Sequence, residues 1–147
     1  MKRGFTLIEI LVVIAIIAIL SVTVFVALNP VQRFQDSRNA RRVQDVNSVL
    51  TAVHEYIVDN DGSLPTGLTT SMAQTELGTC TAGNAACAGV TDCVDLSTPL
   101  GTYLASMPID PQNGSATTTG YTVSVTANNA VTVTACYAEG TTISSTR

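Results

Sequence analysis

The chain has 147 residues, of which 46% are apolar and 12% charged, with 7 Lys and Arg against 11 Asp and Glu. This length holds one domain, and the apolar residues gather near one end, where 20 of the 24 residues from Phe5 to Leu28 are apolar. From Val43 onward the chain carries nine acids and one base, a net charge of 1 − 9 = −8 that repels phosphate backbones. The pattern argues against a soluble cytoplasmic enzyme and against nucleic-acid binding by the polar part.

The apolar run is long enough to cross a membrane. As a helix rising ~1.5 Å per residue it reaches about 36 Å, more than the ~30 Å of a hydrocarbon core. Lys2 and Arg3 precede it, so the positive-inside bias keeps the N-terminus in the cytoplasm and sends residues beyond Pro30 across the membrane. A cleaved signal peptide is the alternative, but the run is longer than a signal core, is followed by no small-x-small cleavage site and contains Glu9.

Glu9 is an acid inside this apolar run and therefore needs a partner. A carboxylate at the centre of a membrane helix costs roughly 2.5 to 3.5 kcal/mol, and less near its end. The first residues, MKRGFTLIE followed by ILVVIAII, resemble the N-terminus of type IV pilins and type II secretion pseudopilins. The match is close over about the first 25 residues.

The resemblance implies processing and assembly into a filament. A prepilin peptidase would remove the leader between Gly4 and Phe5, the new Phe5 amine would be N-methylated, and Glu9 would meet the N-terminal amine of a neighbouring subunit. Pairing fits the physics, because a buried carboxylate without a counter-ion is severely destabilising. Alternatively, Glu9 only complements the positive end of its own helix, which contributes ~0.3–1 kcal/mol. The implied partners are further copies of the chain, the peptidase, the assembly platform in the membrane and, before assembly, membrane lipid.

The residues after the apolar run predict a break and then a second, amphipathic helix. Proline deletes a helical hydrogen bond and clashes with the preceding turn, so Asn29-Pro30 predicts a kink. Gly62 predicts the C-cap of the second helix, and Pro65 stops it. Apolar residues recur every three or four positions and form one stripe along that helix: Val43, Val46, Val49, Leu50, Val53 and Ile57.

Three arginines, Arg38, Arg41 and Arg42, flank the stripe. They can contact anionic headgroups or the acidic head of a neighbour. The alternative is a solvated helix face on which Asp36 and Asp45 are their local partners.

The head beyond Gly62 predicts a loop, a short helix and a hairpin. Residues 63–95 show no sustained period and hold three cysteines, which indicates a disulfide-held loop, whereas Thr98-Pro99 and the apolar residues after it predict a helix over 98–107. Alternation over 121–125 and 131–137, around a turn at 127–130, predicts a β-hairpin whose odd-numbered residues face the helix stripe. The 141–147 tail is expected to be flexible.

An even number of cysteines in the exported part predicts disulfides at Cys80, Cys87, Cys93 and Cys136. A zinc site is the alternative, although the spacing is wider than that of a zinc knuckle. Sequence alone does not choose among the three possible pairings. Loop closure favours Cys80–Cys87 with Cys93–Cys136, and the next choice is Cys87–Cys93 with Cys80–Cys136. On the hairpin, Cys136 falls on the outward face.

Oxygen ligands for calcium are weakly indicated at Asp92, Asp95, Asp110 and Asn113. The resemblance raises this possibility, since major pseudopilins often bind calcium in a late loop, but the four positions match no calcium motif closely. No other metal and no cofactor is predicted. His54, the only histidine, lies beside the helix stripe and is assigned a structural role.

Together these features predict an α+β fold, with a long kinked N-terminal helix packed on a small antiparallel sheet and a disulfide-held loop. We expect a leader at 1–4, a transmembrane and filament-core helix at 5–29, an amphipathic helix at 30–61 and a globular head at 62–147.

The predicted function is that of a structural subunit of a type IV pilus, held in the bacterial cytoplasmic membrane before assembly and in an extracellular filament afterwards. A type II secretion pseudopilin is the alternative within the family. A monomeric membrane-anchored binding or adhesion domain is the alternative from another class. No serine or cysteine has an identifiable base partner, so no enzyme is predicted.

Overall fold

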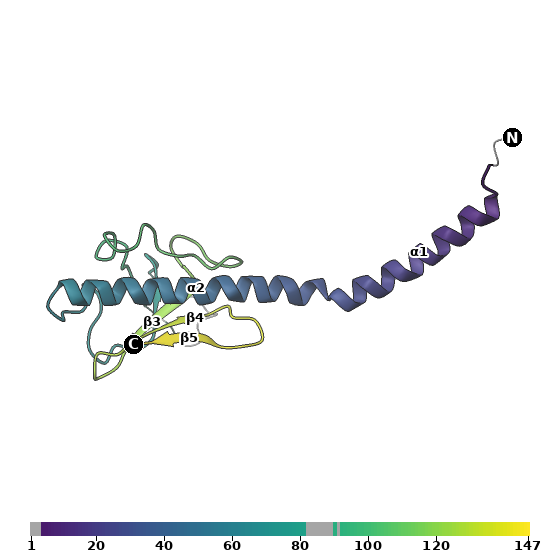
Figure 1. Cartoon of the computed structure of the whole chain (residues 1–147). Helices are drawn as coiled ribbons and strands as arrows, with labels where there is room; N and C mark the ends of the chain where they lie inside the picture. Colours follow the sequence, from purple (N-terminus) through teal and green to yellow (C-terminus); the bar gives the residue numbers. More distant parts are fainter. Residues whose placement is uncertain (1–3, 82–89, 91) are drawn as a thin grey trace. The chain divides into compact units, whose positions relative to one another are not determined.

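The fold is taken from a computed structural model, which describes residues 4–81, 90 and 92–147 (Figure 1). The chain divides into two compact units, residues 1–36 and 37–147, which we treat separately. Cys87 lies outside the described residues.

The first unit is built on helix α1 (Leu7–Leu28), which begins at the cap residue Thr6 and ends at Asn29. Asn29 has a left-handed backbone with φ 40°, and helix α2 (Pro30–Asp59) starts at the next residue. Proline is tolerated there because the first helical residues have no intrahelical partner for their N–H groups. The predicted break at Asn29-Pro30 is confirmed. The segment Leu7–Asp59 is long and apolar enough to cross a membrane.

One face of α2 is buried in the second unit, as the stripe predicts. Val46, Val49, Leu50 and Val53 are at most 1% exposed. Val43 departs from the prediction, because 44% of it is exposed. The helix ends at Asp59, before the predicted C-cap residue Gly62. Asp61 and Gly62 have left-handed backbones with φ 52° and 84°, and the Gly62 N–H donates to the carbonyl of Ile57 at 2.8 Å, the bond that defines a Schellman cap.

The head contains a five-stranded sheet in the order β2-β1-β3-β4-β5. The strands are β1 (Thr75–Leu77), β2 (Cys93–Val94), β3 (Tyr121–Val125), β4 (Val131–Ala135) and β5 (Ile143–Thr146). The predicted hairpin is confirmed as β3–β4, with Val123 opposite Val133. The sheet is mixed, not antiparallel as expected, because β1 and β2 pair in parallel. These strands are only three and two residues long, too short to leave a periodic signal.

Two further expectations for the head are wrong. The tail pairs with β4 as strand β5 and is not free. Residues 97–103 form successive turns and no regular helix, with isolated bonds such as Leu104 N–H to the Leu100 carbonyl at 2.8 Å. Gly101 in the middle of this short segment weakens helix formation relative to alanine.

The hydrophobic core lies between α2 and one face of the sheet, and Figure 1 shows α2 running across strands β3 and β4. The odd-numbered hairpin residues Tyr121, Val123 and Val133 are fully buried against the helix stripe, as predicted. Thr132 and Thr134 alternate with them on the half-exposed face.

Candidate functional site

The N-terminal signature is built around the first turn of α1. The Thr6 side chain accepts a hydrogen bond from the Glu9 N–H at 3.3 Å, while a Glu9 carboxylate oxygen accepts from the Thr6 N–H and hydroxyl, both at 2.7 Å. This reciprocal arrangement is a capping box. In the single chain, the Glu9 carboxylate therefore serves the N-terminus of its own helix. The contribution of Thr6 was missed from the sequence, although its Thr-x-x-Glu spacing is a known capping signal.

The surface of α1 is apolar on all sides. None of its residues is buried, and large side chains such as Ile14, Ile17 and Leu20 are 56–59% exposed. Phe5, just before the helix, is 84% exposed. An exposed apolar surface this extensive marks an interaction with lipid or with other protein.

The disulfides of the head differ from both predicted pairings. Cys80 is bonded to Cys93, 13 residues further along the chain, with their Cα atoms 5.6 Å apart. Cys136 is also disulfide-bonded. The loop-closure argument failed because it ignored β1 and β2, whose parallel pairing places Cys93 opposite Glu76 and so near Cys80. Cys136 follows directly after β4 and is half-exposed, in keeping with the outward face.

A buried ion pair joins α2 to the segment before β3. Nε and Nη2 of Arg42 donate to the two oxygens of the Asp110 carboxylate, at 2.6 and 3.2 Å, and both side chains are 0% exposed. Asp110 also accepts from the N–H groups of Gln112 and Asn113, each at 3.0 Å. Burial alone would raise the pKa of Asp110, but the bonds from Arg42 and from these N–H groups outweigh it and lower the pKa below its ordinary value.

The same cluster holds the connection between β4 and β5. Glu139 accepts from Arg38 Nε at 2.7 Å and from Arg42 Nη1 at 3.0 Å. The Asn39 side chain exchanges two bonds with the backbone of Glu139, at 2.8 and 3.1 Å. The arginine bonds lower the pKa of Glu139 to about 2. We call this cluster the ionic clasp: Arg38, Asn39, Arg42, Asp110 and Glu139.

The clasp corrects the expectations for the three arginines. Arg38 and Arg42 are used inside the head and form neither a solvated face nor a headgroup site. Only Arg41 keeps a predicted local partner, Asp45, at 3.9 Å with most of its side chain exposed. The acids of the clasp lie 68 to 101 residues along the chain from the arginines that bind them, so no local spacing could have revealed these pairs.

The weakly indicated calcium ligands Asp92, Asp95, Asp110 and Asn113 stay a prediction, and two of the acids have partners within the chain. The Asp110 carboxylate accepts from Arg42 and from the backbone N–H of Asn113, and the Asp95 carboxylate accepts from the N–H of Ser97 at 2.8 Å. Among the described residues, the metal-ligand atoms that do cluster, within 4.8 Å, belong to Glu76, Cys80 and Cys93. The two sulfurs of that group are bonded to each other.

His54 is half-buried beside the helix stripe, as expected from the sequence. Its Nε2 atom is buried and has no hydrogen-bond partner in the described part of the chain. No described nucleophile hydrogen-bonds to it, so the arrangement offers no catalytic pair.

Comparison with known proteins places the first 25 residues in a recognised motif. Residues 1–25 match the family model described as the prokaryotic N-terminal methylation motif. No curated protein and no solved structure matches the chain. The match covers Gly4, Phe5 and Glu9 and most of the exposed apolar helix. The chain therefore carries the prepilin-like N-terminal signature that type IV pilins and pseudopilins share.

Proposed function

We propose that this chain is a structural, major-pilin-like subunit of a type IV pilus, polymerised through its N-terminal helix. The observation that carries the proposal is the methylation motif on a helix with no buried residue. Lipid covers such a helix before assembly, and the helices of neighbouring subunits cover it afterwards.

Processing changes the charge at the start of the helix. Cleavage between Gly4 and Phe5 removes Lys2 and Arg3, so the side-chain net charge goes from −4 to −4 − 2 = −6. It also frees a cationic amine at Phe5, four residues before Glu9. In the filament the Glu9 carboxylate pairs with the amine of a neighbour, in addition to capping its own helix. A carboxylate accepts several hydrogen bonds, so the two roles are compatible.

Features of the head favour a pilus surface over a secretion pseudopilus, which is the second candidate. The Cys80–Cys93 disulfide and the ionic clasp fasten three connections of the head to its sheet and to α2. A surface subunit exposed to the medium benefits from such cross-links. The pseudopilin shares the same N-terminal signature and so the same processing.

Substitution of Glu9 tests the proposal. We expect Glu9→Val to leave membrane insertion intact while filament yield falls sharply, because the amine of a neighbour loses its buried counter-ion. Glu9→Gln keeps much of the helix capping without the charge, and we expect it to fail as well. Wild-type yield from both variants would leave Glu9 only its capping role. A head that works as a monomeric adhesin would be indifferent to both changes.

A further inference from the structure

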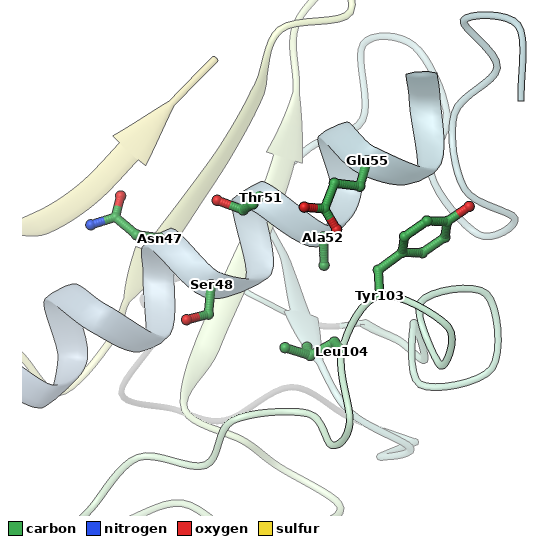
Figure 2. Close-up of a pocket in the computed structure, with 7 residues that line it drawn as sticks. All are labelled: Asn47, Ser48, Thr51, Ala52, Glu55, Tyr103 and Leu104. Atoms are coloured by element: carbon green, nitrogen blue, oxygen red, sulfur yellow. The ribbon is translucent and has the colours of Figure 1, made fainter. Parts of the chain in front are cut away.

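A groove runs between α2 and the turns of residues 97–104. Figure 2 shows Glu55 of α2 on one side and Tyr103 and Leu104 on the other. Its volume is about 360 Å³. Glu55 is the one charged residue among those that line it, which are Asn47, Ser48, Thr51, Ala52, Glu55, Tyr103 and Leu104. A second hollow of about 540 Å³ shares Thr51, Glu55 and Tyr103 and extends to Val58. We call the two together the head groove.

The chemistry of the head groove suits a guanidinium. The exposed carboxylate of Glu55 and the ring of Tyr103 line the same hollow, and arginine combines ion pairing with stacking on an aromatic face. The Tyr103 hydroxyl donates to Asp59 at 2.9 Å, and its ring packs edge-on against Tyr56, so the ring is held in place. Val58, 78% exposed, adds an apolar surface at the far end.

The same chain carries a segment with the complementary character. Among the described basic residues, Arg38 and Arg42 belong to the clasp, Arg41 lies near Asp45, and Arg147 lines the second hollow itself. Arg33 is exposed and forms no ion pair with any described residue. Val31 and Phe34 beside it are 64% and 66% exposed.

We propose that residues 31–34 of a second copy dock in the head groove. The guanidinium of Arg33 enters between the Glu55 carboxylate and the Tyr103 ring, and the exposed apolar side chain of Phe34 covers Val58. Both surfaces lie on α2, 22 residues apart from Arg33 to Glu55, and a helix cannot fold back to join them in one chain. The contact therefore links two copies displaced along the helix direction. This inference rests on the proposed filament and names one of its interfaces.

Charge exchange tests the contact. We expect Arg33→Glu and Glu55→Arg each to lower the yield of sheared filaments by about tenfold or more, since like charges face each other. The double variant should recover most of the wild-type yield. Arg41→Glu makes the same charge change at another exposed position of α2 and should stay close to wild type. The amount of each variant protein in the membrane is measured as well, because the proposal predicts that this amount remains unchanged.

A photo-crosslinker placed at position 34 of intact filaments identifies the occupant directly. The proposal predicts cross-links between copies that map to residues 97–104 or 55–58. A double variant no better than its parents, or cross-links to lipid alone, would overturn it; the second result would make Arg33 a headgroup anchor. Normal filaments from both single variants would also overturn it and leave the proposed function standing. A wild-type chain that forms no filament would overturn both.

Discussion

The two halves of the long N-terminal segment, α1 and α2, share a helical backbone but differ in what covers them. α1 buries none of its residues, whereas α2 buries the stripe from Val46 to Val53 against the sheet and ties Arg42 to Asp110. The head therefore covers its apolar core within one chain, whereas the exposed apolar surface of α1 needs lipid or other protein to cover it. The contacts that stabilise the head lie within one chain, whereas the apolar side chains of α1 remain exposed.

The largest expected effect is a difference in the free energy of unfolding between variants of the neighbouring residues Arg42 and Arg41, because only Arg42 belongs to the buried ion pair. Arg42→Leu leaves the Asp110 carboxylate buried without its counter-ion and should lower the free energy of unfolding by about 3–5 kcal/mol. Arg41→Leu removes an exposed arginine from the same helix and should cost at most ~1 kcal/mol. Urea unfolding of the purified protein in detergent compares the two. Equal losses would show that the clasp does not hold the head.

Substitution of one leucine on each helix compares the contributions of α1 and α2 to the stability of the head. Leu50 is 1% exposed, and Leu50→Ala should destabilise the head by about 2–5 kcal/mol through the cavity it leaves. Leu20 on α1 is 59% exposed, and Leu20→Ala should leave the unfolding of the head unchanged. The comparison fails if the α1 variant lowers the unfolding midpoint as much as the α2 variant does.

The Cys80–Cys93 bridge should contribute about 3 kcal/mol in the chain-entropy model for a loop of this size. Replacing both cysteines by serine should lower the unfolding midpoint and speed proteolysis near the loop, while the β3–β4 hairpin persists. Non-reducing peptide mapping of the wild type should recover Cys80 joined to Cys93. Since only one of the three pairings contains that bridge, Cys136 should be recovered with Cys87. Any other pairing contradicts the arrangement of β1 and β2.

The smallest expected effect is a dependence of head stability on acid. The clasp lowers the pKa of Glu139 from 4.5 to about 2, so its contribution is present above pH 4.5 and is lost as the pH falls towards 2. Asp110, whose pKa is also lowered, acts in the same direction. Glu139→Gln should flatten the decline of the unfolding midpoint between about pH 5 and pH 2. A variant that declines as steeply as the wild type would assign the acid sensitivity to other carboxylates.

Local patterns in the sequence account for the features that were predicted well. The apolar run, Asn29-Pro30, the α2 stripe and the alternating hairpin each carry their signal within a few residues, and each is present in the structure. The parallel pair β1–β2, the strand β5, the Cys80–Cys93 bridge and the clasp depend on segments that meet only after folding. Arg42 shows why local patterns miss such contacts. It follows Arg41 directly, and two adjacent arginines on a helix indicate a solvated face, yet the side chain of Arg42 is 0% exposed.

The mass of the filament subunit tests the central claim most directly. Filaments sheared from the cell surface and identified by electron microscopy should contain a chain that starts at N-methyl-Phe5, without residues 1–4 and with both disulfides intact. Intact-mass spectrometry, followed by fragmentation of the N-terminus, measures this. A subunit that starts at Met1, or at a residue beyond Leu28, would contradict the account, because the exposed helix α1 would then be either unprocessed or absent from the filament.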